Sequence, residues 1–319
     1  MCKIVVIIPV KDDQRVTLAL DSLMAVSADQ DGLAIIVVDN NSSEESYSAL
    51  RDYCCKQRGV TLLVESGEGS YAARNRGILY ALNELQAQIL AFIDSDCIVS
   101  KAWLASIKEA FEDQSVAAVS GRSLGINRNN IAVYEQMLYD EIVGEFLGEP
   151  RLKRIDTRNF AARSSVFESA GLFLPVKFGG DMEFGARIHS LGMVSIYRRE
   201  MVLYHENPWD LGRLLVKRVR QNYGNHELQN YCDTSYLESY LPHLFRYRPA
   251  GFLHKSTLFV RYFFLRVDGF IEFQFAHKIC LVISKFSRRL GYIYFKAIMS
   301  RACRLGDIAF FLNISARQI

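Results

Sequence analysis

Short hydrophobic runs alternate with amphipathic segments over the first third of the chain. The runs have strand length and are apolar at nearly every position: Ile4–Val10, Leu33–Val38, Val60–Val64 and Ile89–Ile93. The segments between them carry apolar residues at helical spacing: Arg15–Val26, Glu44–Lys56 and Tyr71–Leu85. Strands without a polar face are typical of a mostly parallel sheet that is covered by helices on both sides. The pattern therefore predicts an α/β fold.

The same alternation continues and then stops. A helix is expected over Lys101–Glu112, with Ser100 as its N-cap, and strands over Val116–Val119 and Val202–Tyr204. Beyond Pro208 the pattern changes to helices rich in aromatic residues and arginine, over Leu211–Gln221, Leu253–Phe275 and Ile279–Arg304. We therefore predict an α/β domain over residues 1–210 and a basic, aromatic-rich helical C-terminal region over residues 211–319.

Composition excludes several classes of protein. The chain has 319 residues, of which 50% are hydrophobic and 23% charged, so it is neither disordered nor a small disulfide scaffold. Its seven cysteines are an odd number without CxxC spacing, which favours a reducing compartment and disfavours a zinc site. The N-terminal segment is interpreted as a strand, not a signal peptide, and no apolar run approaches the ~18 residues of a membrane span. Together these features predict a cytoplasmic protein.

Charge is divided unevenly along the chain. Residues 245–319 contain 13 Lys and Arg against 3 acidic residues, a net charge of +10, whereas the remainder has a net charge of −7. Arginines mixed with large aromatic residues at helical spacing favour a helix that lies on an anionic membrane surface, peripheral to the inner face of the cell membrane. A packed helical subdomain is the alternative, and a nucleic-acid partner is not expected.

Polar residues follow each of the four predicted strands. Asp12 follows the first strand, Asp39 ends the second, and the fourth ends in Asp94-Ser95-Asp96. Ligands of parallel α/β sheets bind beyond the carboxyl ends of the strands. In an extended segment Asp94 and Asp96 face the same way, about 6.5–7 Å apart, so the D-x-D motif is suited to hold Mg²⁺ or Mn²⁺ with substrate phosphates.

A glycine-containing turn after the third strand allows a rival interpretation. Gly67-x-Gly69-x-x-Ala72 precedes a predicted helix, as in a dinucleotide-binding fingerprint. However, that fingerprint normally follows the first strand of its unit. Arg74 and Asn75 in the first helical turn, together with a helix N-terminus, suit any diphosphate, including that of a nucleotide sugar.

An ordered set of motifs resembles family 2 glycosyltransferases, which have the GT-A fold. The motifs are Ile7–Val10, Val37–Ser42, Tyr71–Ile78, Ile93–Asp96, Asn159–Arg163, Ala170–Phe173, Gly179–Arg187 and His205. They appear in the order of the family and cover about residues 3–206. The resemblance implies a nucleotide-diphospho-sugar transferase of Rossmann-like α/β architecture, with a mixed, mostly parallel sheet, followed by a C-terminal α-helical region.

The resemblance also implies roles for individual residues. Pro9, Asp12 and Asp39 match the nucleotide-base pocket, Arg74 the donor diphosphate site, and Asp94, Ser95 and Asp96 the ribose–diphosphate and metal site. His205 matches a position that completes the metal shell in some members. Asp181 matches the general base, although Gly180 stands where many members carry Glu, and Glu183 is an alternative base. Asn159 and Arg163 are candidates for substrate contact or support.

These assignments predict an inverting, metal-dependent hexosyltransferase that uses a nucleotide sugar, with UDP-sugar expected. A cation with Arg74 would stabilise the leaving diphosphate, and one carboxylate would deprotonate the acceptor hydroxyl. The acceptor is expected to be a saccharide or a lipid-linked glycan of cell-surface polysaccharide or glycolipid assembly. The alternatives are a nucleotidyltransferase-like enzyme and a non-catalytic, membrane-docked scaffold that retains the fold.

Overall fold

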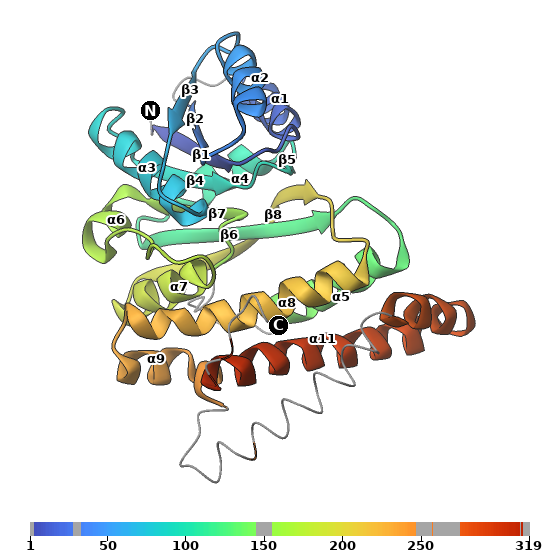
Figure 1. Ribbon diagram of the computed structural model, residues 1–319. Helices are drawn as coiled ribbons and strands as arrows, with labels where there is room; N and C mark the ends of the chain where they lie inside the picture. The colour runs from blue at the N-terminus through green and yellow to red at the C-terminus, as the bar shows by residue number, and fades with distance from the viewer. Residues whose placement is uncertain are drawn as a thin grey trace. The chain divides into compact units, whose positions relative to one another are not determined.

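The computed structural model describes residues 3–27, 33–144, 155–246, 257, 275–312 and 314. The chain forms two compact units (Figure 1). The first consists of Met1–Ile126 and Glu145–Glu206, and the second of Asn127–Gly144 and Asn207–Ile319. The division at Glu206 lies near the predicted boundary. The second unit also takes in Asn127–Gly144, which the sequence analysis assigned to the α/β domain.

The first unit is an α/β structure. Its strands are β1 (Ile4–Val10), β2 (Leu33–Asp39), β3 (Val60–Val64), β4 (Ile89–Ile93), β5 (Cys97–Val99), β6 (Val116–Gly125), β7 (Asn159–Arg163) and β8 (Val194–His205). Its helices are α1 (Val16–Ser27), α2 (Glu44–Cys54), α3 (Ser70–Asn83), α4 (Trp103–Ala110), α6 (Ser164–Ala170) and α7 (Gly180–Ser190). Ala102, not Ser100, is the N-cap of α4, and Ser100 contributes only its carbonyl, which accepts from Trp103 N at 3.0 Å.

The eight strands form one mixed sheet in the order β3-β2-β1-β4-β7-β6-β8-β5. β1 to β4 are mutually parallel, as predicted, whereas β7 runs antiparallel to both β4 and β6. Only Asp94–Asp96 separate β4 from β5 in sequence, yet β5 pairs with β8 at the far end of the sheet. This link therefore carries the D-x-D motif from the mouth of β4 to His205, which pairs with Cys97.

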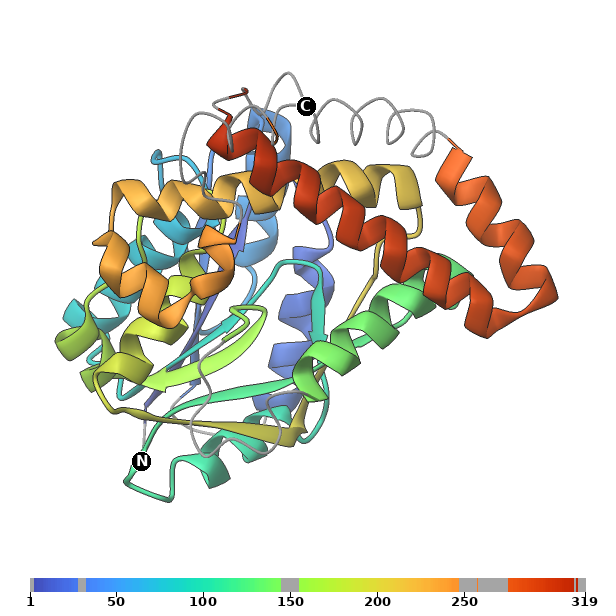
Figure 2. The same cartoon turned by 90° about the horizontal axis from the view of Figure 1, so that it is seen from below.

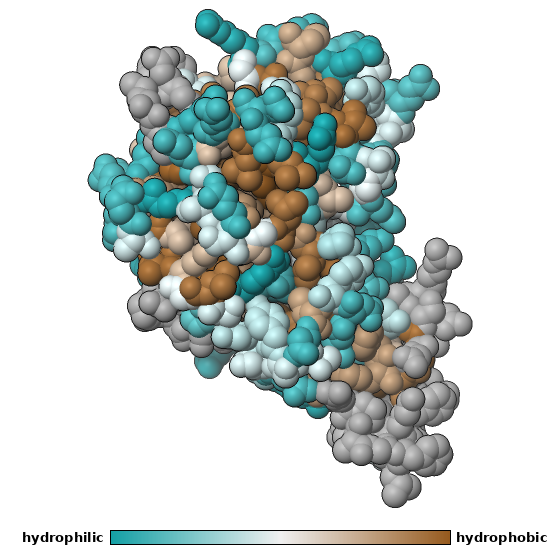
Figure 3. Space-filling model, turned by 90° about the vertical axis from the view of Figure 1, so that its left-hand side faces the viewer, coloured by the Kyte–Doolittle hydropathy of each residue, from teal (hydrophilic) through white to brown (hydrophobic). Residues whose placement is uncertain are grey.

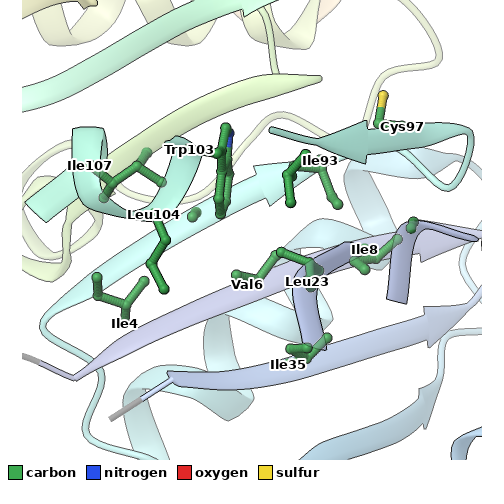
Figure 4. Packing of buried hydrophobic residues seen from close by; sticks show 14 of the residues in the cluster. Ile4, Val6, Ile8, Leu23, Ile35, Ile93, Cys97, Trp103, Leu104 and Ile107 are labelled. Atoms are coloured by element: carbon green, nitrogen blue, oxygen red, sulfur yellow. The ribbon is translucent and has the colours of Figure 1, made fainter. Parts of the chain in front are cut away.

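Hydrophobic residues on both faces of the sheet are buried. On one face the strands pack against α1 and α4 through residues such as Ile8, Leu23 and Trp103 (Figure 4). On the other, α3 lies so close to β1 that a Cβ at Gly77 would stand 2.6 Å from Ile7. The surface in Figure 3 is mainly hydrophilic, with hydrophobic side chains emerging in patches, which is ordinary for a globular protein.

The second unit is helical. It contains α5 (Asn130–Gly144), α8 (Leu211–Asn225), η1 (His226–Asn230), α9 (Thr234–Tyr240), η2 (Pro242–Phe245), a helix over residues 275–286, and α11 (Arg288–Phe311). Its core joins Ile131 and Tyr134 of α5 to apolar residues of α8 and α11, which is why α5 groups with this unit (Figures 1 and 2). None of the helices among the described residues is long and apolar enough to cross a bilayer.

The single helix predicted over Ile279–Arg304 is in fact two. Ser287 has extended backbone angles and its hydroxyl accepts from Leu290 N at 3.3 Å, so it ends one helix and caps α11. The predicted helix over Leu253–Phe275 lies outside the described residues, except for Thr257 and Phe275.

Candidate active site

Asp39 ends β2 at the carboxyl edge of the sheet and lies beside the end of β1, where Pro9 pairs with Val38. The residue is only 3% exposed, and Ser42 N donates to its Oδ2 at 3.4 Å. Oδ1 is buried and has no hydrogen-bond partner among the described residues. Because an unsatisfied buried carboxylate oxygen is costly, this atom is suited to accept a hydrogen bond from a ligand.

Asp12 has a structural role in the loop after β1. It adopts a left-handed conformation, with φ at 50°, and its carboxylate accepts from Ser43 N at 2.8 Å while its own N–H donates to Ser42 Oγ at 2.9 Å. The hydrogen bonds from Ser43 lower the pKa of Asp12. Asp12 thus ties the loops after β1 and β2 together beside Asp39.

Asn40 fixes the glycine-containing turn before α3. Its Nδ2 donates to the carbonyls of Glu65 and Gly67 at 3.0 and 2.5 Å, and its Oδ1 accepts from Gly69 N at 2.9 Å. Gly69 has φ at +104°, a conformation that other residues rarely adopt. The turn is therefore held rigidly where α3 begins.

Arg74 is buried in the second turn of α3 and pairs with Asp94 at the mouth of β4. Its Nη2 lies 2.5 Å from Asp94 Oδ1, and its Nε has no partner among the described residues. Arg74 is 3% exposed. Burial raises the pKa of Asp94, the Arg74 guanidinium opposes this rise, and Asp96 adds to it. A buried guanidinium with a spare N–H next to two carboxylates is suited to a diphosphate and its cation.

Asp96 and Ser95 belong to a polar network that sequence reasoning missed. Ser95 Oγ donates to Asp13 Oδ2 at 2.8 Å, and Arg15 Nε to Asp13 Oδ1 at 2.8 Å. Arg15 Nη1 also lies 3.6 Å from Asp96 Oδ2 and 3.8 Å from the carboxylate of Glu206. Ser95 is therefore committed to the loop after β1, and Arg15 balances part of the negative charge of Asp96.

His205 contacts Arg158 and not the carboxylates of Asp94 and Asp96. Its Nε2 lies 3.1 Å from Arg158 Nη1, and Arg158 is held by Asp156 through contacts of 2.6–3.1 Å. Burial and the Arg158 guanidinium lower the pKa of His205, which favours the neutral imidazole. Its Nε2 thus already has Arg158 as a partner.

The predicted metal shell is only partly present. Within the described ranges, no group of three or more His, Cys, Asp or Glu side chains is arranged to hold a metal ion. Asp94 and Asp96 still offer hard oxygen donors, and Mg²⁺ or Mn²⁺ needs only one or two carboxylates when substrate phosphates complete the shell. The site therefore fits a cation held by two aspartates and a diphosphate, and His205 is not part of a ready-made shell.

Asp181 is the second residue of α7 and is held by Tyr71 of α3. Tyr71 Oη donates to Asp181 Oδ1 at 2.9 Å and accepts from Asp181 N at 3.0 Å. Burial, and to a smaller extent the negative charge of Asp181, raises the pKa of Tyr71 well above its ordinary value. The phenol therefore stays protonated. A Cβ at Gly180 would lie 2.9 Å from the Tyr71 ring, so the absence of a side chain at this position allows Tyr71 to approach the start of α7.

Glu183 has a structural role. Its carboxylate is 2% exposed and accepts from Arg187 Nε and Nη2 at 3.0 and 2.7 Å. Arg187 in turn donates to the carbonyls of Ala170 and Leu172 at 2.5 and 3.0 Å. The pair fixes α7 against the loop after α6, so the Glu183 carboxylate is engaged by Arg187.

Comparison with known proteins agrees with this geometry. Residues 5–173, more than half of the chain, match the model of "Glycosyl transferase family 2". The chain belongs to glycosyl transferase family 2. It is 28% identical over 225 residues to Glycosyltransferase AglE of Haloferax volcanii, covering 69% of this chain and 71% of that protein. It is 22% identical over 218 residues to Probable glycosyltransferase YdaM of Bacillus subtilis, covering 65% of this chain but only 51% of YdaM.

Solved structures share the fold. The mannosyltransferase PcManGT from Pyrobaculum calidifontis, in complex with GDP-Man and Mn²⁺, superposes with a TM-score of 0.66 at 17% identity, covering 97% of this chain and 87% of that one. S. aureus TarS residues 1–349 give a TM-score of 0.51 at 12% identity, covering 97% and 91%. These likenesses confirm the predicted GT-A fold.

Two residues of the family 2 motifs, Asn159 and Arg163, make contacts that favour support, one of the two roles expected for them. Arg163 is at the opposite edge of the sheet, where it pairs with Ile89 at the start of β4 and donates to the carbonyls of Val116 and Phe111 at 2.8 Å. Asn159 is fully buried: its Oδ1 accepts from Trp103 Nε1 at 2.9 Å. Its Nδ2 donates to two backbone carbonyls, at 2.9 and 2.8 Å.

Asn159→Ala should therefore destabilise the fold without altering substrate affinity. The change leaves Trp103 Nε1 and the carbonyls of Arg122 and Met201 without their partner, which should lower the free energy of unfolding by about 3 kcal/mol. Urea denaturation measures this, with exposed Asn83→Ala as the matched control. Unchanged stability combined with a raised KM for the acceptor would restore the contact role.

Proposed function

We propose that this chain is an inverting glycosyltransferase that moves a hexosyl group from a nucleotide sugar to an acceptor hydroxyl, with Asp181 as the general base. The observation that carries the proposal is an unbroken run of contacts. Asp94 pairs with Arg74, the Arg74 guanidinium lies 5.5 Å over the Tyr71 ring, and Tyr71 hydrogen-bonds to Asp181. This run joins the diphosphate-binding side of the site to the base.

Asp39 would select the nucleotide. Its buried Oδ1, which has no partner among the described residues, would accept the imide N–H of uracil, and Pro9 would lie beside the base. This favours a UDP-sugar, although guanine and thymine present comparable N–H groups. PcManGT is described with GDP-Man and Mn²⁺, which supports the general class of donor.

The reaction would be a single displacement. The acceptor oxygen forms a bond to the anomeric carbon while the bond from that carbon to the diphosphate oxygen breaks. The acceptor proton passes to Asp181, and the leaving diphosphate keeps the electron pair of the broken bond. Arg74 would stabilise the negative charge that develops there, through its spare Nε–H. A bound Mn²⁺ or Mg²⁺, held by Asp94 and Asp96, would neutralise further charge on the leaving group.

The acceptor we propose is a saccharide or lipid-linked glycan of cell-surface polysaccharide or glycolipid assembly, met at the cytoplasmic face of the membrane. The basic character of residues 245–319 supports an anionic surface as the place of work. The alternatives, a nucleotidyltransferase and a non-catalytic scaffold, do not require a base facing the diphosphate site.

A panel of UDP-, GDP- and dTDP-sugars tests this proposal. We expect release of one nucleoside diphosphate in the presence of Mn²⁺, without release of pyrophosphate. Pyrophosphate release would favour the nucleotidyltransferase, and release from no donor, with no binding of UDP or GDP by calorimetry, would favour the scaffold.

Tyr71→Phe should lower kcat about tenfold with little change in the KM for the donor. The variant removes both hydrogen bonds between Tyr71 and Asp181, and a hydrogen bond to a charged group is worth about 1.5–3 kcal/mol. Because the phenol stabilises the carboxylate, the acidic limb of the pH–rate profile should also move to higher pH. Gly180→Ala, which displaces the Tyr71 ring, should reproduce the fall in kcat. A folded Tyr71→Phe protein with an unchanged kcat and pH profile would exclude this positioning role.

A further inference from the structure

A row of large hydrophobic side chains lies exposed along the helix over residues 275–286. Phe275, Ile279, Val282 and Phe286 are 50%, 37%, 53% and 86% exposed. Their spacing of four, three and four residues places them on one face of the helix. Leu290 and Ile293, 54% and 53% exposed, follow in sequence on the first turns of α11.

The opposite side of these helices is buried, so the exposed row is not needed for the core. Ala276, Cys280 and Phe295 are fully buried in the apolar cluster of the second unit. Tyr134 Oη donates to Ser284 Oγ or the Arg288 carbonyl, at 2.8 and 3.0 Å, and anchors the turn between the two helices. Figure 2 shows the two helices joined at this turn. The row is therefore presented by a supported scaffold.

The charges within this stretch of the chain have one sign. Residues 275–306 contain seven Lys and Arg and no Asp or Glu. Lys296 is paired with Glu141 of α5. Lys278, Lys285 and Arg289 are exposed, and Lys278 and Lys285 lie one residue away from members of the apolar row. We call the six apolar side chains and these three cations the apolar-basic face.

We propose that the apolar-basic face binds the surface of a bilayer rich in anionic phospholipid, with its apolar row at the acyl boundary and its cations on the headgroups. The inference rests on the proposed function, since it would place the enzyme where a lipid-linked acceptor resides. A nucleic acid would engage the cations but leave Phe286 in water. A second copy of the chain would bring two sets of like charges together.

Vesicle co-sedimentation tests this inference, using the full chain and no sugar substrate. The wild-type protein should bind phosphatidylcholine vesicles with about 30% phosphatidylglycerol at least tenfold more tightly than vesicles of pure phosphatidylcholine. At this composition the anionic surface attracts basic side chains strongly. Higher salt should weaken the binding, because the electrostatic part is screened.

Leu290→Glu is the decisive variant. A glutamate three residues after the Ser287 N-cap completes a capping box and lies near the positive end of α11, so the change should not destabilise the helix. Leu18→Glu is the matched control, because Leu18 is an equally exposed leucine, at 53%, on α1 of the first unit. We expect Leu290→Glu to weaken vesicle binding at least tenfold and Leu18→Glu to leave it unchanged.

These measurements distinguish a membrane from a second copy of the chain or a nucleic acid as the partner of the apolar-basic face. Absence of wild-type binding, or an equal loss in both variants, would overturn the inference. So would sedimentation velocity that shows a dimer dissolved by Leu290→Glu, or tight binding to RNA that survives Leu290→Glu. Because no donor or acceptor is present, these results do not depend on glycosyl transfer, and failure of the donor panel would leave vesicle binding unaffected.

Discussion

Asp181→Asn is expected to lower kcat about 10³-fold while the KM for the donor stays within a few-fold of the wild-type value. Asparagine keeps an oxygen that can accept from Tyr71 and Met182 N, which now donate to Asp181 Oδ1 at 2.9 and 2.8 Å, so the start of α7 should keep its conformation. The variant loses only the capacity to take the acceptor proton, and general base catalysis is worth typically about 10²–10⁴-fold. Initial rates over a range of acceptor concentrations measure the effect.

Glu183→Gln is the matched control for this prediction. It removes a carboxylate two residues further along the same helix, but that carboxylate is buried against Arg187. We expect the control to reduce stability, because a buried ion pair loses its charge, and to retain kcat within a few-fold in the folded protein. A Glu183→Gln kcat as low as that of Asp181→Asn, or an active Asp181→Asn protein, would mean that the base has been misassigned.

Asp94→Asn is expected to lower kcat/KM for the donor by about 10²–10³-fold and to weaken Mn²⁺ binding. The variant removes one of the two carboxylates that we assign to the cation. It also leaves the buried Arg74 guanidinium without its charged partner at 2.5 Å. Loss of groups that stabilise a developing negative charge typically costs this much. Electron paramagnetic resonance of Mn²⁺ with UDP or GDP measures binding, and initial rates measure activity.

Chelation provides the internal control for this second prediction. EDTA should reduce the wild-type rate strongly, and Mn²⁺ should restore it. The Asp94→Asn protein should lose little more on chelation, because two changes that disable one site do not add. Asp113→Asn, at the opposite edge of the sheet near Arg163, should behave as wild type. Full EDTA sensitivity of the Asp94→Asn protein would place the cation elsewhere.

Local pattern was sufficient for the parallel half of the sheet. The strands Ile4–Val10, Val60–Val64 and Ile89–Ile93 were predicted with their observed bounds, because each is an apolar run flanked by polar or glycine residues. Because these strands are parallel, the polar residues at their carboxyl ends lie at the same edge of the sheet. For this reason the positions of Asp39, Arg74 and Asp94 followed from the sequence.

Roles that depend on distant partners could not be predicted in this way. Nothing near Asn159 indicates that Trp103 and the carbonyls of Arg122 and Met201 surround its amide, and the same amide on a loop would be a plausible substrate contact. Glu183 likewise reads as a second candidate base until Arg187, one helical turn later, is seen to hold it. That spacing of four residues was the available signal.

The partners of the candidate site residues could not be predicted for a similar reason. Tyr71 belongs to one of the family 2 motifs, yet its hydrogen bond to Asp181 spans 110 residues of sequence. Arg158 reaches His205 across 47 residues, and β5 leaves its sequence neighbour β4 to pair with β8. Hydrophobic periodicity determines which face of an element is buried, but it contains no information on which remote side chain a polar group meets.

The configuration of the new glycosidic bond tests the central claim most directly. Proton NMR of the product formed from an α-configured nucleotide sugar should show a β-linkage from the first turnovers, because one carboxylate base and direct attack on the anomeric carbon invert that centre. A product that retains the α-configuration would contradict the account. Retention requires two displacements and an enzyme nucleophile, and the proposed mechanism has one displacement and uses Asp181 as a base.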